Sequence, residues 1–595
     1  MGAYIQKNTP PPNKVFNFSL NDFSGGLNNR SDLLEDNELT SINNMIFADE
    51  SLFEKRKGQE LYDESIDFDE PIVFLDEFKP YKEENVLIQA TPTKFYVNGA
   101  LLTTIEGKVS GINHRGRYFF ADGSKLYCYG KFAQTEGDYV KITGTEVDDY
   151  VLMEVVTPDE GYTPLEGEHI EGVTHINYTD YEVSYEPCKL EVDDEFKGDN
   201  VVPEGVRYIA SHLGRMFVSG ADDDNDNVFI TDVKNSFYFP VFLPMQLPPN
   251  SDRIVGLKVY DNSVLVGREK DIHAITGNTN RPDFGVEVFR LNKLNTHVGF
   301  ASHHAVDIAH NFLFFLGSDA NVYALSTTKG DDRVLVTKHI SRQLDMRKEP
   351  ISIDINDLSD SHSAFVRDEW FLTIQDKTLV YSYLTQAWTV LSDLDATSSY
   401  EKDFELIWGN SDGKLVHFSP DNYTDFGEPY ECHIFSKYFD MDEASNFKSF
   451  KEFFVVAHTY ENYNSDIRAF FEIDYDDVRD RVVIANQISI WGTAVWGDRF
   501  IKHNINPSLP FVIRRRGRNI RFKFFNGYYR DGDVATHSDL ETYEGRIEGV
   551  MVWVTDEENF YLYKDREWVL LTDKDLNQRM KIYQVNGDYE MRGKR

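Results

Sequence analysis

The chain has 595 residues, several times the length of a typical domain, which predicts two or three domains. It carries 100 acidic side chains against 61 lysines and arginines, a net charge of -39. A surface of this charge repels phosphates, which excludes a protein that grips nucleic acid through its overall charge. The cysteines Cys128, Cys188 and Cys432 lie far apart, which excludes a CxxC zinc site and a disulfide scaffold.

Aromatic residues make up 14% of the chain, with 43 phenylalanines and 33 tyrosines. Rings pack well on a pleated, half-buried surface, and long helical periodicity is nearly absent, so the sequence predicts an all-β fold. No apolar run approaches a membrane span, and the first residues lack the apolar core of a secretory signal. We therefore expect a soluble protein without a membrane anchor, made in the cytoplasm.

The first 60 residues contain an extended arm, a strand and a short helix in this prediction. Residues 1–14 are polar and carry three consecutive prolines, which favour an extended chain. Residues 16–30 alternate apolar and polar side chains before a Gly-Gly turn, which predicts a strand. The segment 35–46 is predicted to be helical because four apolar residues share one helical face: Leu34, Leu39, Ile42 and Met45.

A loose unit recurs between residues 70 and 420. It has an apolar strand, a turn rich in Gly, Asp or Asn, and a second strand that ends in aromatic residues. Seven such phrases begin at Glu84, Gly116, Gly214, Asn262, Asn311, Glu369 and Glu405. From Gly214 onward the starts lie 36 to 58 residues apart, close to the roughly 40–50 residues of a four-stranded blade. The repeat predicts a β-propeller, with an array of β-sandwiches as the alternative.

The remaining segments complete the predicted domain organisation. Long alternating strands at 447–460 and 509–527 predict a C-terminal β-sandwich. Residues 16–58 lack local strand partners, so we expect them to pair with it and form a β-sandwich-like platform. The predicted domains are an N-terminal arm and platform segment (1–60), the first propeller blades (61–136), an acidic, loop-rich insertion (137–204), the remaining propeller blades (205–425) and a C-terminal β platform domain (426–595).

Two polar clusters resemble metal sites in composition, but neither has the ligand pattern that a metal site requires. Asp222, Asp224 and Asp226 alternate as at the start of a calcium loop, but Asn227 and Val233 replace the glycine and glutamate that an EF-hand requires. A solvated hairpin turn is the favoured interpretation. His303 and His304 are adjacent, and neighbours in a strand point to opposite faces, so we expect exposed or satisfied histidines and no chelate. No catalytic motif, metal or cofactor is predicted.

A basic cluster stands out in this acidic chain. Its members are Arg514, Arg515, Arg516, Arg518, Arg521 and Lys523. Two interpretations stay open, contact with DNA phosphates or pairing with acidic groups of the same chain or of another subunit. The second is favoured, which makes the cluster a candidate subunit interface.

Several phrases resemble the start and end of phage tail nozzle and neck structural proteins, a β-propeller family that includes tail tubular protein B. At the N-terminus the matching residues are Gly25, Gly26, Leu27, Asn28, Asp36, Asn37, Glu38, Asn43, Asn44, Lys55, Arg56 and Gly58. Residues 408–430 resemble the last propeller blade of that family. RRRGRNIRFKFFNG and the closing YEMRGKR resemble its C-terminal end.

The resemblance implies a virion structural protein, without enzymatic activity, in a ring of about six copies at the phage neck or tail nozzle. The ring lines the channel through which genome DNA leaves, below portal-side and neck adaptor proteins and above tail fibre or distal tail proteins. An acidic wall fits that task, because DNA must pass without being held. The alternatives are a tail-tip protein that binds host glycans, or a glycan hydrolase on a propeller, although no pair of acids is selected for catalysis.

Overall fold

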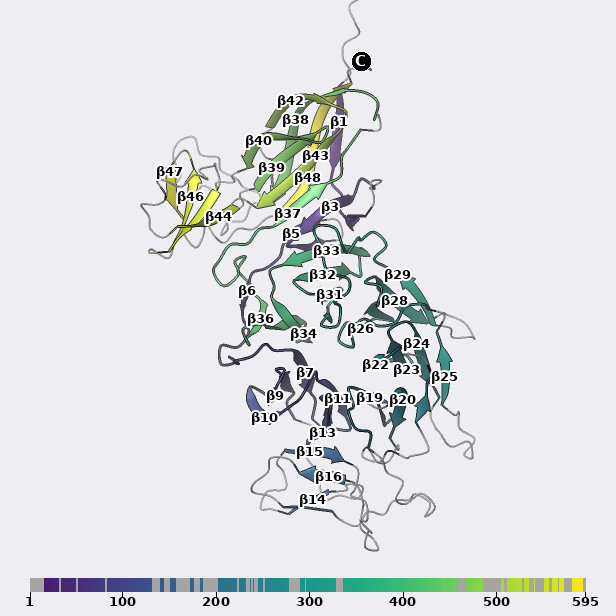
Figure 1. Ribbon diagram of the computed structural model, residues 1–595. Helices are drawn as coiled ribbons and strands as arrows, with labels where there is room; N and C mark the ends of the chain where they lie inside the picture. Colours follow the sequence, from purple (N-terminus) through teal and green to yellow (C-terminus); the bar gives the residue numbers. More distant parts are fainter. Residues whose placement is uncertain are drawn as a thin grey trace, which may run out of the picture.

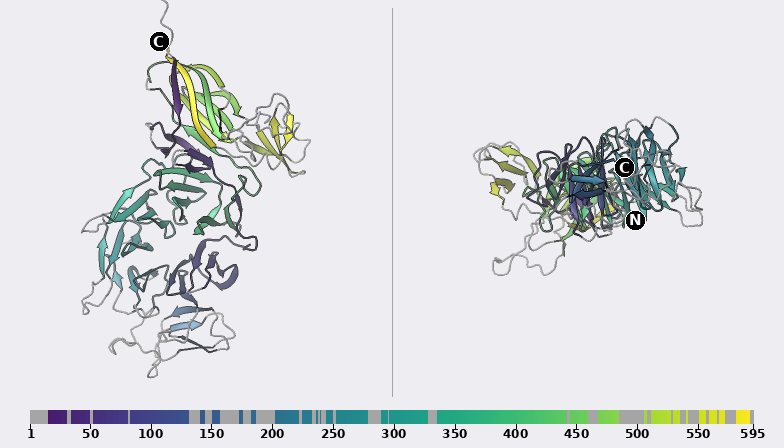
Figure 2. Two further views of the ribbon diagram at one scale, coloured as in Figure 1. Left: turned by 180° about the vertical axis from the view of Figure 1, so that it is seen from behind. Right: turned by 90° about the horizontal axis from the view of Figure 1, so that it is seen from below.

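The computed structural model describes most of residues 15–591 (Figure 1). Its longer gaps are 131–139, 157–171, 186–201, 278–288, 485–504, 541–549 and 572–580. The described part is all-β, as predicted, and contains no α-helix. It has many small antiparallel sheets and a two-sheet layer formed by the two ends of the chain. A view from behind shows the same elongated arrangement (Figure 2).

Seven small sheets occupy the region between the two terminal segments. Their strands, sheet by sheet, are β7–β10 (Phe74–Phe78, Val86–Ala90, Lys94–Val97, Ala100–Thr104); β11–β13, β15 and β16 (Ser110–His114, Arg117–Ala121, Leu126–Gly130, Val151–Val156, Gly172–His175); β18–β21 (Tyr208–His212, Arg215–Ala221, Asp224–Ile230, Met245–Gln246); β22–β25 (Ile254–Tyr260, Ser263–Arg268, Ile272–Thr276, Arg290–Lys293); β26–β29 (Val306–Ala309, Phe312–Leu316, Val322–Thr327, Leu335–His339); β30–β33 (His362–Val366, Glu369–Ile374, Lys377–Ser382, Ala387–Ser392); and β34–β36 with β6 (Ala396–Lys402, Glu405–Asn410, Leu415–Phe418, Gln59–Leu61).

The seven repeated phrases form the second and third strands of these seven sheets. The phrase from Asn262 gives β23 and β24, for example, and the phrase from Asn311 gives β27 and β28. All six residues of β23 are buried, and so are four of the five residues of β27. A strand that is covered on both faces has apolar residues at successive positions, so apolar and polar side chains do not alternate in these phrases.

Most successive sheets share apolar cores, and the last sheet lies beside the first. Phe78 and Phe120 belong to a core between the first and second sheets, and Leu265 and Phe315 to a core between the fourth and fifth. The first strand of the last sheet, β34, lies beside β7 of the first sheet. Ile72 and Ile407 pack in a core that these two sheets share. The last sheet is completed by β6, which comes from the N-terminal segment and pairs with β36.

The two ends of the chain form two further sheets that pack face to face. One contains β4, β5, β48, β38 and β41, with β1 on β48 and β42 on β38. The other contains β2, β3, β37, β43, β39 and β40. The bounds are β1 Val15–Leu20, β2 Gly26–Leu27, β3 Glu38–Asn43, β4 Met45–Asp49, β5 Leu52–Lys55, β37 His433–Ser436, β38 Lys448–His458, β39 Ile467–Ile473, β40 Asp476–Ile484, β41 Ile505–Pro507, β42 Phe511–Gly517, β43 Ile520–Asn526 and β48 Lys581–Met591.

A cluster of phenylalanines joins the two sheets of this layer. The Phe453 ring of β38 lies 5.1 Å from Phe522 of β43 and 6.3 Å from Phe471 of β39, measured between ring centroids. The pairings of β1 and β5 with β48, and of β3 with β37, confirm the prediction that residues 16–58 pair with the C-terminal strands.

Two small sheets lie outside these groups. The first contains β44–β47 (Tyr529–Val534, Val550–Val554, Asn559–Lys564, Glu567–Leu570) and projects to one side of the two-sheet layer in Figure 1. The second is the pair β14 and β17 (Val140–Thr143, Glu182–Tyr185). Much of the predicted insertion 137–204 lies outside the described residues, but β15 and β16 of that segment extend the second small sheet.

The predicted helix at 35–46 is wrong, because the segment forms β3 and β4. A bulge between Leu39 and Ser41 shifts the register of β3 against β37. Leu39 and Ile42 can therefore both be buried although they are three residues apart, the spacing that suggested a helix. Asn44 then adopts a φ of +54°, which ends β3 before Met45 begins β4.

The N-terminal segment also lies against the sixth small sheet, and Gly26 permits that contact. Its φ is +63°, and a Cβ atom there would lie 2.8 Å from both the Ala387 Cβ and the Trp388 carbonyl oxygen on β33. We expect Gly26→Ala to lower the free energy of unfolding by about 2–5 kcal/mol, the sum of a left-handed backbone penalty and overpacking. Chemical denaturation followed by tryptophan fluorescence measures the change.

Gly427→Ala is the matched control for this prediction. Gly427 also has a positive φ, +90°, but a Cβ atom there would meet nothing within 4 Å. We expect only the backbone penalty, about 1–2 kcal/mol. Equal losses in the two variants would show that the contact with β33 contributes nothing.

Candidate functional site

The N-terminal residues that carry the family resemblance meet the segment 423–430 at one buried point, here called the junction and formed by Asn44, Arg56, Asp425 and Tyr430. The Arg56 guanidinium donates to both carboxylate oxygens of Asp425, at 2.8 and 2.7 Å, and is 1% exposed. It also lies over the Tyr430 ring, 3.8 Å from the centroid. Such a bidentate pair fixes both side chains in direction as well as distance.

Asn44 connects the junction to the sixth small sheet. Its side-chain oxygen accepts bonds from Arg56 Nε and from the Ser392 amide, both at 3.0 Å. Its side-chain nitrogen donates to the Glu431 carbonyl at 2.9 Å, and its amide donates to Val390 at 2.9 Å. Asn44 is fully buried, so each of these bonds replaces one to water.

Lys55 and Gly58 extend the same contact. Lys55 is 1% exposed and donates to the Tyr423 carbonyl at 3.1 Å, and its burial lowers the pKa of its amine to about 8. A Cβ atom at Gly58 would lie 2.0 Å from the Thr424 carbonyl oxygen, so only glycine fits there. The segment 423–430 therefore contacts three neighbouring residues of the N-terminal segment: Lys55, Arg56 and Gly58.

The basic cluster divides into an exposed part and a paired part. Arg515 and Arg516 are exposed on β42, which pairs only with β38 among the described strands, and Arg518 is exposed just beyond it. Arg521 and Lys523 are half-buried on β43 and both pair with Glu472, at 3.3 Å for Arg521. The side chain of Arg514 lies outside the described residues. Three of the six side chains are thus exposed on or just after β42, a strand of the two-sheet layer that Figure 1 shows beyond the small sheets.

The acidic segment 222–227 is part of a hairpin. From Asp224 onward it belongs to β20, which pairs with β19, whereas Asp222 lies outside the described residues. One oxygen of Asp226 lies 2.6 Å from the guanidinium of Arg268, whose side chain is fully buried. Asp226 therefore neutralises a buried cation of the neighbouring sheet. Within the described residues no three His, Cys, Asp or Glu side chains are close enough together to hold a metal ion.

The two adjacent histidines lie in a turn before β26, so the strand geometry expected for them is wrong. Their ring centroids are 5.1 Å apart. His303 Nε2 makes a hydrogen bond with Ser110 Oγ at 3.1 Å. Burial lowers the pKa of both imidazoles, that of His304 to about 3, so both are neutral at physiological pH. Sequence reasoning missed this arrangement because the partner Ser110 comes from a different sheet.

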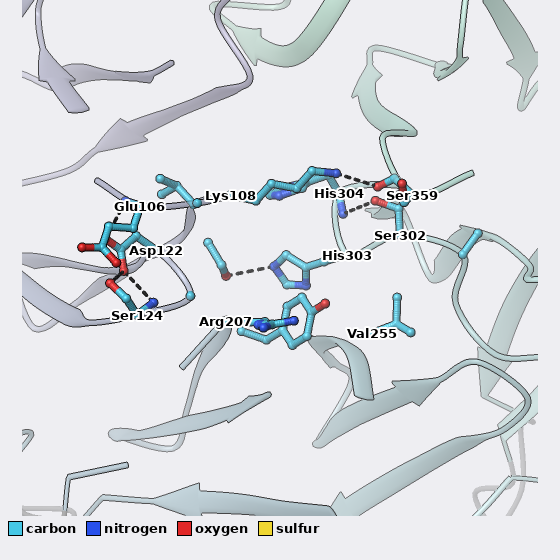
Figure 3. Close-up of a pocket in the computed structure, with 16 residues that line it drawn as sticks. Glu106, Lys108, Asp122, Ser124, Arg207, Val255, Ser302, His303, His304 and Ser359 are labelled. Carbon is cyan, nitrogen blue, oxygen red and sulfur yellow. Dashed lines mark hydrogen bonds between the residues drawn. The ribbon is translucent and has the colours of Figure 1, made fainter. Parts of the chain in front are cut away.

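A cavity of about 460 Å³ opens beside these histidines. In Figure 3 the His303 ring lies between Lys108 and Arg207. The Lys108 amine donates to the Ser359 carbonyl at 3.1 Å and pairs with Asp360. Asp122 accepts bonds from the amides of Ser124 and Lys125, at 2.9 and 2.7 Å. Lys108 and Asp122 are thus engaged in internal bonds, and Ser110 and His303, which also line the cavity, are joined by the hydrogen bond described above.

Comparisons with known proteins add little. A scan of protein families and a search of curated proteins find no match. Among solved structures, a computationally designed protein called Ika8 is 11% identical, with a TM-score of 0.30, over 59% of this chain and 97% of that one. An extracellular domain described as that of a one-component system from B. thetaiotaomicron is 8% identical, with a TM-score of 0.27, over 88% of this chain and 53% of that one. Neither similarity is high enough to carry an argument about fold or function.

Within the described residues no helix is long and apolar enough to cross a membrane.

We expect Asp425→Asn to lower the free energy of unfolding by about 3 kcal/mol, because it leaves the Arg56 charge buried without its counter-ion. Thermal and chemical denaturation measure the loss. Asp36→Asn is the matched control, since Asp36 also pairs across the two ends of the chain, with Lys437 at 2.6 Å, but is 84% exposed. The control should change stability by less than about 1 kcal/mol. A similar small effect in both variants would contradict the role given to the junction.

Proposed function

We propose that the protein is a structural component of a phage virion, in which about six copies form a ring at the neck or tail nozzle. The seven small sheets are the blades of a β-propeller, and the two face-to-face sheets are the platform that carries it. The protein acts without catalysis, and genome DNA passes through the ring. Its other partners are adaptor or portal-side proteins on one side and tail fibre or distal tail proteins on the other.

The propeller assignment rests on how the succession of sheets ends. In a propeller the last blade is completed by a strand from the other end of the chain, which removes the exposed edges that an open row would leave. The pairing of β6 with β36, and the position of β34 beside β7, fit that closure. An array of independent sandwiches does not require either contact.

The ring assignment rests on one observation: several resemblance residues lie where the two-sheet layer meets the small sheets. Gly26, Asn44, Arg56 and Gly58 were matched to the nozzle and neck family by sequence alone. Each of them makes a contact that the packing of the two units requires. If the short phrases matched by chance, the matching residues would not be expected to coincide with those that join the platform to the small sheets. The resemblance therefore carries weight although the motifs are short.

Charge supports the expected passage of DNA. A net charge of -39 disfavours binding of phosphates, and Arg515, Arg516 and Arg518 form a local group of exposed basic side chains on and just after β42. At a seam between copies they would meet the acidic surface of a neighbour, where opposite charges steer association. We therefore place Arg515, Arg516 and Arg518 at the subunit seam.

The triple variant Arg515→Ala, Arg516→Ala, Arg518→Ala tests this placement. We expect it to weaken self-association at least about 10-fold, or about 1.4 kcal/mol, while the melting temperature of the protomer stays unchanged. Mass photometry over a concentration series measures the assembly, and particle imaging gives the copy number. The control removes three exposed charges from the small sheets instead: Arg253→Ala, Arg290→Ala, Lys338→Ala.

Three results would count against the proposal. A wild-type protein that remains monomeric at all concentrations and in the particle would exclude the ring. Tight, salt-sensitive DNA binding that the triple variant loses would make the cluster a DNA site. Binding of soluble glycans, or release of reducing sugars from them, would favour the tail-tip alternatives.

A further inference from the structure

A second cavity lies at the centre of the small sheets, separate from the basic cluster. Its volume is about 360 Å³, and residues from the first strands of six of the seven sheets line it: β7, β11, β22, β26, β30 and β34. It adjoins the cavity of Figure 3, because His303 and His304 line both. Side chains from distant parts of the sequence therefore line one cavity.

Three carboxylates from three strands line this central cavity: Asp76, Asp307 and Glu401. Asp76 accepts the Tyr118 hydroxyl at 2.6 Å, Asp307 accepts the Ile308 amide at 2.7 Å, and Glu401 accepts the Phe404 amide at 2.8 Å. Within the described residues none of the three has a cationic side chain within ion-pair distance. Lys258 is the only lysine or arginine in the lining and does not pair with them.

Asp76 and Asp307 are partly shielded from water, and the nearby Lys258 favours their charged forms without making an ion pair with them. Burial raises the pKa of Asp76 to about 6 and raises the pKa of Asp307 as well. Burial lowers the pKa of the three lining histidines, His303, His304 and His362, which leaves them neutral near pH 7. At that pH the ionised carboxylates outnumber the single lysine of the lining, so a cation entering the cavity would be attracted.

His362 supplies a hydrogen-bond acceptor with no partner. Its Nδ1 lies 3.4 Å from the Asp360 carbonyl oxygen, and a carbonyl can only accept, so the proton of the neutral ring is assigned to Nδ1. Nε2 then carries a lone pair. That atom is buried and unpaired, and His362 is only 6% exposed. Ser399 Oγ, from β34, is also buried and unpaired beside the same cavity.

We propose that this central cavity binds a small organic cation with several N–H donors, of the class of primary alkyl diamines. The carboxylates supply the charge complement, and His362 Nε2 and the carboxylate oxygens accept the N–H donors. A bare metal ion fits poorly, because no three ligating side chains of the described residues converge. Apolar wall residues, Val306, Ala364 and Phe365, suit the methylene chain of a diamine. The proposal does not depend on ring assembly.

Isothermal titration calorimetry on the full chain tests the proposal with three probes at constant ionic strength. We expect 1,4-diaminobutane to bind with one site per chain. Tetramethylammonium has the charge but no N–H donors, and 1,4-butanediol has donors but no charge, so both should bind at least about 10-fold more weakly. Equal binding of the diamine and tetramethylammonium would overturn the assigned hydrogen bonds, and no binding of the diamine would overturn the site.

Two cavity variants locate the binding. Asp307→Asn removes one charge with little change in shape, and His362→Phe removes the Nε2 acceptor. Each should weaken diamine binding at least about 10-fold, and the second keeps the test valid if the first fails to fold. Asp412→Asn, an exposed carboxylate outside the lining, is the control and should leave binding unchanged. Unchanged binding in both cavity variants would place the diamine elsewhere and overturn the proposal.

Discussion

The buried ion pair between Arg56 and Asp425 joins segments that lie 369 residues apart in the chain. Burying two charges is costly unless their remaining donors and acceptors are satisfied. Asn44 accepts from Arg56 Nε, and the Lys57 carbonyl accepts from the guanidinium at 3.0 Å. Asp425 in turn accepts the Gln59 amide at 3.0 Å. The start of β6 is thereby fixed relative to the C-terminal half of the chain.

The position of this pair explains how the first 60 residues serve two units at once. Before Arg56 the chain contributes β1–β5 to the two face-to-face sheets, and directly after it β6 enters the last small sheet. The junction lies where the chain changes from one unit to the other. Neither unit can be completed before the C-terminal half is present, because β5 pairs with β48 and β6 pairs with β36. Contacts of such long sequence separation carry a large loop-closure cost, which buried, specific bonds help to offset.

Charge is organised differently at three levels of the structure. The chain as a whole is strongly acidic, three exposed arginines lie together on and just after the edge strand β42, and the central cavity holds three carboxylates with a single lysine. Charged side chains on an edge strand also discourage uncontrolled strand pairing, so Arg515 and Arg516 would favour a defined neighbour over aggregation. Glu472 pairs with Arg521 and Lys523, so the five described basic side chains form two groups, three exposed and two paired.

The sequence by itself determined the features that arise from neighbouring residues. Buried hairpins such as β23–β24 and β27–β28 were recognisable because both strands and their turn lie within one short apolar phrase. The all-β character followed from the aromatic composition in the same way. The tertiary structure alone decided the pairing of β3 with β37, the division of the basic cluster and the turn geometry of His303. In each case the deciding partner, whether Ile434, Glu472 or Ser110, lies far away in the chain, so no local pattern of residues encodes the contact.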